Sequence, residues 1–496
     1  MQFLLTAADS WDFASLSGDF NPLHVDPIAA RRLQFGGTVC HGIHQMLKAL
    51  DLAVGAEKLQ PVRIQSIAAV FNARLRAGSL AQVMYAPDSA NTRARLVVML
   101  DQRPVLTVKL SLQDGMPLGP PPLSAGPVSA RPPNSPRVSN DGLVDPAGGA
   151  VPVQLNEALA QKLFPNLFCR QDGPSLMADL LASTRIVGME CPGLHSIYSE
   201  LKLTRRATSA QRQSLAAEPA TEMAYSVQRY DARFRSVRIS VSGGVMEGTL
   251  NAFFRAPPVS QIDFDSLVAL VPANSFVGQR ALIVGGSRGL GEVVAKVLLA
   301  GGAHVTLTYV QGKADAEKIR CEVQQSGRDL QIMQLDVSRP LPEALQIEMA
   351  GVDYSHLYYF ATPHIASGLA GKWSPTLFDD YCRIYVHGFS ALVQILVQGI
   401  DRAHPLTVLY PSTVFLDAPP TGFTEYCAAK ASGEVLCKHL ARSLAVHIHS
   451  PRLPRLQTDQ NGSFMGVEGD LPLPVILAQL QSMCTEADGV RAADQV

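Results

Sequence analysis

A carboxylate and an imidazole stand five residues apart near the start of the chain, in the stretch Ser17-Gly-Asp-Phe-Asn-Pro-Leu-His-Val-Asp26. Its glycine and proline predict a tight loop that brings Asp19 close to His24. Two such groups can hold one water molecule and transfer protons at neighbouring carbons of a substrate. The competing interpretation is a capped loop, in which Asp19 or Asn21 caps a helix and His24 is a core residue.

A tyrosine and a lysine four residues apart, Tyr426 and Lys430, could carry a second kind of chemistry. They share one face of a predicted helix, where the lysine ammonium would lower the tyrosine pKa from its usual value of about 10. The phenol could then protonate an alkoxide while a nearby hydroxyl holds the carbonyl oxygen. We assign that hydroxyl to Ser412, with Thr413 as its rival.

A glycine-rich turn joins the apolar run 281–284 to an apolar helical stretch. Gly285, Gly289 and Gly291 have the spacing Gly-x-x-x-Gly-x-Gly, which allows a tight turn and lets backbone amides approach a pyrophosphate. Strands and helices alternate downstream, so we predict a parallel, doubly wound sheet.

The choice of cofactor follows from the end of the next predicted strand, Thr308 to Lys313, which carries no acid before Asp315. A pocket specific for NAD usually offers an acid there to the ribose 2′-hydroxyl. Arg288 in the glycine turn could instead meet a 2′-phosphate. The sequence therefore favours NADP(H).

A stretch rich in proline, glycine and serine divides the chain, because it cannot continue a helix or an inner strand. A weaker break lies at Arg255-Ala-Pro-Pro258. The predicted parts are a first domain at 1–114, a linker at 115–150, a second domain at 151–256 and a third domain at 260–496.

The two segments on either side of the linker repeat one another. A shift of 130 residues places Ser66-Ile67 on Ser196-Ile197 and Arg76-Ala77 on Arg206-Ala207. In each segment an apolar helical stretch precedes strands that alternate apolar and polar residues. We therefore predict an α+β double hotdog in the N-terminal half and an α/β doubly wound Rossmann fold in the C-terminal half.

Composition limits the partners and the location. The chain has 42 basic and 43 acidic residues without a long run of either sign, which argues against nucleic acid or a membrane surface as partner. Its eight cysteines form no metal-binding pattern, and no apolar run approaches the roughly 18 residues of a membrane helix. We expect a cytoplasmic protein with reduced thiols and no metal site.

The loop of Ser17 to Asp26, together with Phe35 and the step His41-Gly42, resembles the signature of MaoC-like hotdog enzymes, the (R)-specific enoyl-thioester hydratases. The resemblance implies catalytic roles for Asp19 and His24 and substrate binding by Asn21, His41 and Gly42. A backbone amide at the start of the central helix would polarise the thioester.

The second repeat lacks this signature, since positions 149–154 read Gly-Ala-Val-Pro-Val-Gln. We expect one active half and one supporting half, with His195 structural. Four arginines could face a phosphopantetheine arm, although arginines at strand ends are usually just solvated; they are Arg74, Arg76, Arg205 and Arg206.

Residues 278 to 470 resemble the short-chain dehydrogenase/reductase family through the glycine turn and the Tyr-x-x-x-Lys step. The resemblance implies Tyr426 as general acid, Lys430 as its tuner and ribose anchor, and Ser412 as the carbonyl-orienting group. The cofactor-binding residues it implies are Gly285, Ser287, Arg288, Gly289, Leu290, Gly291, Asp336, Val337 and Lys430.

This half departs from the family pattern at several positions. Tyr359-Phe-Ala-Thr362 replaces Asn-Asn-Ala-Gly, Tyr385 replaces a helix asparagine, and Pro454-Arg455 replaces Pro-Gly. Val284 replaces a threonine. Because the family's asparagine orders a relay water beside the lysine, cofactor binding is a safer expectation than efficient catalysis.

The two resemblances imply consecutive reactions, because a reduced 3-oxoacyl thioester is the substrate of a dehydratase. We expect a bifunctional enzyme that acts on acyl-CoA or acyl carrier protein thioesters. The alternatives are an active hydratase with a degenerate reductase domain and a non-catalytic NADP(H)-binding scaffold. A homodimer is expected by analogy only.

Overall fold

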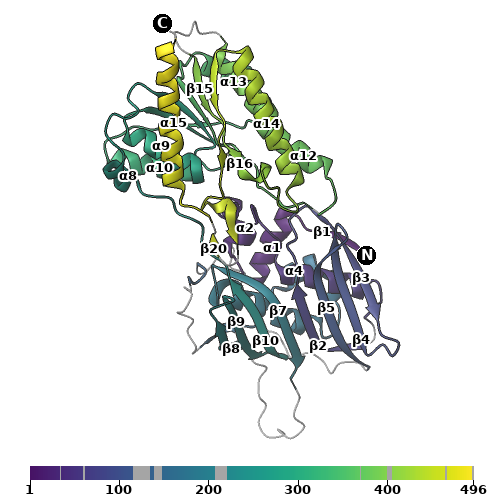
Figure 1. The fold of residues 1–496 in the computed structure, drawn as a ribbon. Coiled ribbons are helices and arrows are strands. Elements are labelled where there is room, and N and C mark those ends of the chain that lie inside the picture. Colours follow the sequence, from purple (N-terminus) through teal and green to yellow (C-terminus); the bar gives the residue numbers. More distant parts are fainter. Residues whose placement is uncertain are drawn as a thin grey trace. The chain divides into compact units, whose positions relative to one another are not determined.

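The computed structural model divides the chain into two units, and Figure 1 shows their helices and strands. The first unit comprises 1–257 with 463–466, and the second comprises 258–462 with 467–496. The structure describes residues 1–33, 35–59, 62–114, 135–138, 148–206, 221–368, 370–398, 405–463, 466–467 and 469–493. Most of the predicted linker lies outside these residues, so the predicted domain boundaries stay predictions.

In the described part of the first unit, ten strands form one antiparallel sheet in the order β1-β3-β4-β5-β2-β7-β10-β9-β8-β6. The two halves of the sheet follow the same strand order outward from the centre. There β2 pairs with β7, from the pair Ser66 with Thr204 to the pair Val70 with Glu200. The strands are β1 (Gln2–Leu4), β2 (Val62–Phe71), β3 (Leu80–Pro87), β4 (Arg93–Leu100), β5 (Arg103–Asp114), β6 (Gly149–Pro152), β7 (Ser196–Arg205), β8 (Glu222–Asp231), β9 (Ser236–Gly243) and β10 (Met246–Phe254).

Each half of this sheet holds one long buried helix, as predicted. The helix α4 (Gly42–Gly55) begins at the His-Gly step, and α7 (Gly173–Arg185) continues into the π-helix η1 (Ile186–Glu190). Both helices contribute to one hydrophobic core with the strands. The shorter helices are α1 (Ala7–Ser17), α2 (Pro22–Val25), α3 (Pro27–Ala30), α5 (Glu157–Leu163) and α6 (Pro165–Phe168). The antiparallel hotdog architecture is thus confirmed.

The described part of the second unit contains a six-stranded parallel sheet in the order β13-β12-β11-β14-β15-β17. This is the strand order of a Rossmann fold, which confirms the predicted doubly wound class. The strands are β11 (Arg280–Val284), β12 (His304–Tyr309), β13 (Gln331–Gln334), β14 (His356–Tyr359), β15 (Leu406–Leu409) and β17 (Val446–His449). Two-residue strands also form the pairs β16 (Ser412–Thr413) with β18 (Arg452–Leu453) and β19 (Gly462–Ser463) with β20 (Gly466–Val467).

Helices cover both faces of this sheet (Figure 1), and each face has a hydrophobic core of its own. One core contains α8 (Phe264–Leu270), α9 (Gly289–Ala300), α10 (Lys313–Gln325) and α15 (Pro472–Ala493). The other contains α11 (Glu343–Ala350), α13 (Phe389–Val397) and α14 (Thr424–Ser443). The remaining helices are α12 (Pro375–Cys382), the π-helix η2 (Arg383–Gly388) and the 3-10 turns η3 (Val414–Leu416) and η4 (Asp459–Asn461).

The cysteines and helix lengths bear on the expected environment. All eight cysteines lie among the described residues, and within these residues none forms a disulfide bond. In the part of the chain that the structure describes, no helix combines the length and apolar character needed to cross a membrane.

Candidate active sites

The acid–base loop of the first unit is built by local capping. The helix α1 ends at Gly18, whose φ of 74° lies in the left-handed region that favours glycine. Asn21 then caps α2 by accepting a hydrogen bond from the Leu23 amide, with Pro22 at the first helical position. The capping role that the competing interpretation gave to Asn21 is therefore real, but it leaves the Asp19 carboxylate free for other contacts.

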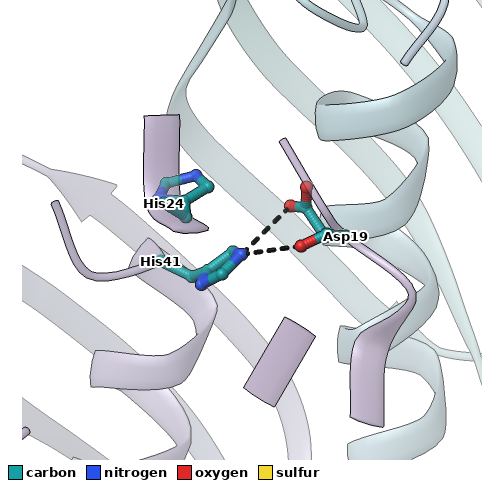
Figure 2. Close-up of side chains that lie close together, drawn as sticks. All are labelled: Asp19, His24 and His41. Atoms are coloured by element: carbon teal, nitrogen blue, oxygen red, sulfur yellow. Dashed lines mark hydrogen bonds and ion pairs between the residues drawn. The ribbon is translucent and has the colours of Figure 1, made fainter. Parts of the chain in front are cut away.

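Asp19, His24 and His41 come together at this loop (Figure 2). The Nδ1 atom of His24 lies 2.7 Å from the carbonyl oxygen of Val39, which can only accept. His24 therefore carries its proton on Nδ1 and keeps a lone pair on Nε2. The Nε2 atom of His41 lies 3.0 Å from the Asp19 carbonyl oxygen and 3.9 Å from the Asp19 carboxylate.

The second repeat supplies the support for this carboxylate. Thr184, near the end of α7, donates a 2.7 Å hydrogen bond to Oδ2 of Asp19, and the Asn21 amide donates to Oδ1. The side chain of Asn21 donates to the carbonyl oxygens of Gly188 and Gly193. A Cβ atom at Gly188 would overlap the Asp19 carboxylate, so only glycine fits there. The half without the signature thus completes the site.

The environment shifts the pKa values of Asp19 and His24 in opposite directions. Burial raises the pKa of the Asp19 carboxyl, against the opposing effects of His24, Thr184 and Asn21. Burial lowers the pKa of the His24 imidazole, and the cationic Arg255 lowers that pKa further. Both shifts favour the uncharged forms, and an acid that holds its proton beside a base that lacks one is the pair that general acid–base catalysis uses.

The three side chains also resemble a metal-binding set, since one ligand atom of each lies within 4.8 Å of the others. The rings of His24 and His41, however, stack at 3.8 Å with an angle of 26° between their planes. Lone pairs of nearly parallel rings do not converge on one ion. The geometry therefore favours proton transfer over a shared metal.

The predicted substrate-binding residues of this loop have different positions. Asn21 is buried and its side chain holds the loop through hydrogen bonds, and His41 joins the cluster of Asp19 and His24 through its ring. Gly42 is the first residue of α4, where amides lack partners within the helix. Sequence reasoning missed Thr184 and Gly188, because neither residue carries a local signal.

The glycine turn of the second unit has the shape that a dinucleotide requires. Gly285 and Gly289 have φ values of 79° and 62°, and a Cβ at Gly291 would overlap the backbone of Gly285. The Gly285 and Gly286 amides are tied to Thr308 on the neighbouring strand β12. This tight turn at the start of α9 fits a pyrophosphate group.

The other predicted cofactor residues lie at the same carboxyl edge of the sheet or in the turn. Arg288 precedes α9 and pairs with Asp459 at 3.8 Å. Asp336 follows β13 and accepts hydrogen bonds from the amide and hydroxyl of Ser338. Ser287 and Val337 are buried, and Leu290 packs against the core.

The three predicted catalytic residues of the second unit, Ser412, Tyr426 and Lys430, are brought together only in part. Tyr426 and Lys430 lie on α14, as expected. Ser412 donates a 2.6 Å hydrogen bond to Glu434, which also binds Arg452. Thr413 instead hydrogen-bonds with the Tyr426 phenol and lowers its pKa. The structure therefore favours the rival, Thr413, as the hydroxyl beside the tyrosine.

The electrostatics of this site differ from the sequence expectation. Burial raises the pKa of Tyr426 to about 12, and burial lowers the pKa of Lys430 to about 7. The Lys430 ammonium donates a 2.8 Å hydrogen bond to the Pro411 carbonyl oxygen. The expected lowering of the tyrosine pKa by lysine is thus wrong, because desolvation outweighs any such effect.

Two of the departures from the family pattern contact each other. The Tyr385 hydroxyl, held in the π-helix η2, lies 2.6 Å from the Thr362 hydroxyl. The Nζ atom of Lys430 lies over the ring of Tyr385, 4.0 Å from the ring centroid. Tyr410 donates to the Tyr385 carbonyl oxygen. The ring of Tyr385 thus stands where the family carries an asparagine, and its hydroxyl meets Thr362, which stands where the family carries a glycine.

Comparisons with known proteins match both units. A family model described as a MaoC like domain matches residues 2–94, and one described as short chain dehydrogenase matches 279–450. An NADPH-dependent aldehyde reductase-like protein of Arabidopsis thaliana is 26% identical over 193 residues, which are 35% of this chain and 69% of that protein. Tetrahydroxynaphthalene reductase PfmaG of Pestalotiopsis fici is 25% identical over 36% of this chain and 63% of its own length.

Solved structures also match. A short chain dehydrogenase from Burkholderia cenocepacia in complex with NADP is 21% identical, with a TM-score of 0.36 over 41% of this chain and 89% of that chain. The MaoC-like match lies within the first unit, and the short-chain dehydrogenase match lies within the second. The chain therefore joins an N-terminal MaoC-like dehydratase domain to a C-terminal short-chain dehydrogenase/reductase domain.

Proposed function

We propose that the first unit interconverts (R)-3-hydroxyacyl and trans-2-enoyl thioesters, and that the second unit reduces 3-oxoacyl thioesters with NADPH. The observation that carries the proposal is the cluster of Asp19, His24 and His41, in which one polar atom of each side chain lies within 4.8 Å of the others and burial shifts the pKa values of Asp19 and His24 in opposite directions. The product of such a reductase is the substrate of such a dehydratase. The two domains of one chain would therefore serve consecutive steps.

In the hydration direction, His24 is the base and Asp19 is the acid. The free Nε2 of His24 takes a proton from water while the water oxygen bonds to the β-carbon. The protonated Asp19 gives its proton to the α-carbon. A proton then passes from His24 back to Asp19, which restores both groups, and dehydration runs through the same steps in reverse.

Two features of the loop support these roles. Asp19 and His41 are buried while His24 is half-buried, so the base faces an incoming substrate and the acid lies behind it. The first amides of α4, beginning at Gly42, suit the thioester oxygen as enolate character develops.

Absorbance of the enoyl thioester tests the first half. The full-length protein should hydrate crotonyl thioesters, and Asp19→Asn and His24→Ala should each abolish this activity while the fold is retained. An enoyl absorbance that stays constant with every chain length and carrier would overturn the hydratase assignment.

In the second unit, NADPH would supply a hydride to the carbonyl carbon. The glycine turn would hold its pyrophosphate, and Arg288 would meet its 2′-phosphate. Thr413 and Tyr426 would hold the carbonyl oxygen, and Tyr426 would donate its proton to the resulting alkoxide. A phenol with a raised pKa stays protonated at neutral pH, which suits reduction better than oxidation.

A second candidate is a hydratase with a reductase domain that binds NADPH but turns over slowly. The Tyr385–Thr362 pair and the lowered pKa of Lys430 favour it. Titration by NADPH fluorescence and a single-turnover assay with a 3-oxoacyl thioester separate the two. Binding without oxidation of NADPH would support the second candidate, and multiple turnovers that Tyr426→Phe abolishes would support the bifunctional enzyme.

A further inference from the structure

The four arginines at the strand ends of the first unit differ in how their charge is balanced. In the second repeat, Arg205 donates a 2.6 Å hydrogen bond to Asp172, and Arg206 lies 3.7 Å from Glu247. Both guanidinium groups are thus neutralised by the protein itself. They have no need of an external anion.

The pair in the first repeat has no such balance. Arg76 donates a 2.6 Å hydrogen bond to the carbonyl oxygen of Phe35, and the Arg74 guanidinium lies over the ring of Phe35 at 5.8 Å. Among the described residues, no carboxylate forms an ion pair with either arginine. Two like charges therefore contact one residue. Burial lowers the pKa of Arg74, and repulsion from Arg76 lowers it further. An anion would relieve this repulsion.

The same segment is tied to the acid–base loop. The carbonyl oxygen of Leu75, between the two arginines, accepts a 2.8 Å hydrogen bond from the amide of Cys40, which precedes the catalytic cluster residue His41. Leu75 is fully buried while Arg74 is half-buried and Arg76 exposed. The two guanidinium groups thus face away from the core at the start of α4.

Phe35 supplies the second connection. Its ring packs against the cluster of Leu23, Leu33 and Val39. Leu23 is the neighbour of His24, and the Val39 carbonyl oxygen accepts from the His24 ring. The arginine pair therefore stands on the outer side of the loop that holds the catalytic base.

We propose that Arg74 and Arg76 bind the phosphate of the 4′-phosphopantetheine arm that carries the acyl group. This inference rests on the proposed hydratase function and names the carrier end of its substrate. Guanidinium groups bind phosphate oxygens through paired, charge-assisted hydrogen bonds. The two repeats then differ in purpose, since only the one with the acid–base loop keeps its arginine pair available.

A comparison of substrates with and without phosphate tests the proposal. The readout is the ratio of kcat/KM for hydration of crotonyl-coenzyme A to that of crotonyl-N-acetylcysteamine, measured on the full-length protein. The double variant Arg74→Gln/Arg76→Gln should lower this ratio about tenfold, mainly through KM. Arg206→Gln is the matched control from the second repeat, and it should leave the ratio as it is.

A third substrate, crotonyl-acyl carrier protein, separates the sources of phosphate. Equal losses with coenzyme A and with the carrier protein would place the site at the arm phosphate that both share. A loss with coenzyme A alone would contradict this assignment and point to the nucleotide phosphates. An unchanged ratio in the double variant would overturn the proposal outright.

Binding of the free carriers separates failure of this inference from failure of the hydratase function. Isothermal titration should show coenzyme A binding that weakens about tenfold in the double variant, while pantetheine should bind equally to both proteins. If no thioester is hydrated but this difference persists, the phosphate site stands and the hydratase assignment falls. If hydration proceeds but coenzyme A binds both proteins equally, the phosphate site falls alone.

Discussion

The two sites of this chain treat their titrating groups in different ways. At Asp19, burial raises the pKa of the carboxyl, and this rise is opposed by the partner His24 and by the hydrogen bonds from Thr184 and Asn21. At Tyr426, burial likewise raises the pKa of the phenol, but the opposing effect comes from Thr413 rather than from the partner Lys430, whose own pKa burial lowers to about 7. A motif alone therefore does not establish a working site, since the surroundings decide the protonation states.

The two sites also differ in the residues that hold their titrating side chains in place. The Asp19 carboxylate receives a hydrogen bond from Thr184, which comes from the other repeat. Lys430 instead donates to a backbone carbonyl oxygen and lies on the face of Tyr385. In the first site, a residue from the other repeat holds the carboxylate of the acid–base pair. In the second site, the contacts of Lys430 are with the surrounding protein, and Tyr385 takes the place of the family's relay asparagine. Variants at each site can test this contrast.

Asp19→Asn should have the largest effect. The amide can neither donate an acidic proton nor accept one, so hydration of crotonyl thioesters should fall at least about a thousandfold. The NADPH-dependent rate of the same preparation is the internal control and should be unchanged. Residual hydration near the wild-type rate would remove Asp19 from the mechanism and with it the contrast between the sites.

Gly188→Ala should have the next largest effect, although the residue belongs to the repeat without the signature. Its added methyl would overlap the Asp19 carboxylate and push it out of position. Misplacement of a catalytic group on this scale costs roughly a hundredfold in kcat. Gly37→Ala is the matched control, because a Cβ there meets no atom within 4 Å. Equal activity of the two variants would show that the second repeat does not position Asp19.

Much of both folds was predictable because it depends on local patterns. The helix α4 begins at the predicted His-Gly step, and β11, α9 and β12 follow the predicted alternation closely. Thr184 was not predictable, because it lies 165 residues from Asp19 and its role arises only when the repeats pair. The pKa of Tyr426 was mispredicted for a similar reason, since the direction of its shift depends on burial within the folded chain.

Thr413→Ala and Ser412→Ala sharpen the comparison at the second site. Thr413 hydrogen-bonds with the Tyr426 phenol, whereas Ser412 is bound to Glu434. We expect loss of the Thr413 hydroxyl to lower kcat for 3-oxoacyl reduction by about thirtyfold, and loss of the Ser412 hydroxyl by less than about threefold. NADPH affinity, measured by fluorescence, should be equal in both. The reverse order of effects would restore Ser412 as the carbonyl-orienting residue.

Thr184→Val should have the smallest effect and the most informative pH dependence. Its lost hydrogen bond stabilises the ionised form of Asp19, so the variant should have an Asp19 pKa above that of the wild type. Dehydration needs the Asp19 carboxylate as a base, and this activity disappears as the pH falls through that pKa. The acid limb of kcat/KM for dehydration should therefore move to higher pH, with about a tenfold loss at neutral pH. Thr184→Ser should restore both the rate and the limb, because it keeps the hydroxyl. A lower rate with an unmoved acid limb would mean that Thr184 only packs the repeats together and does not tune the acid.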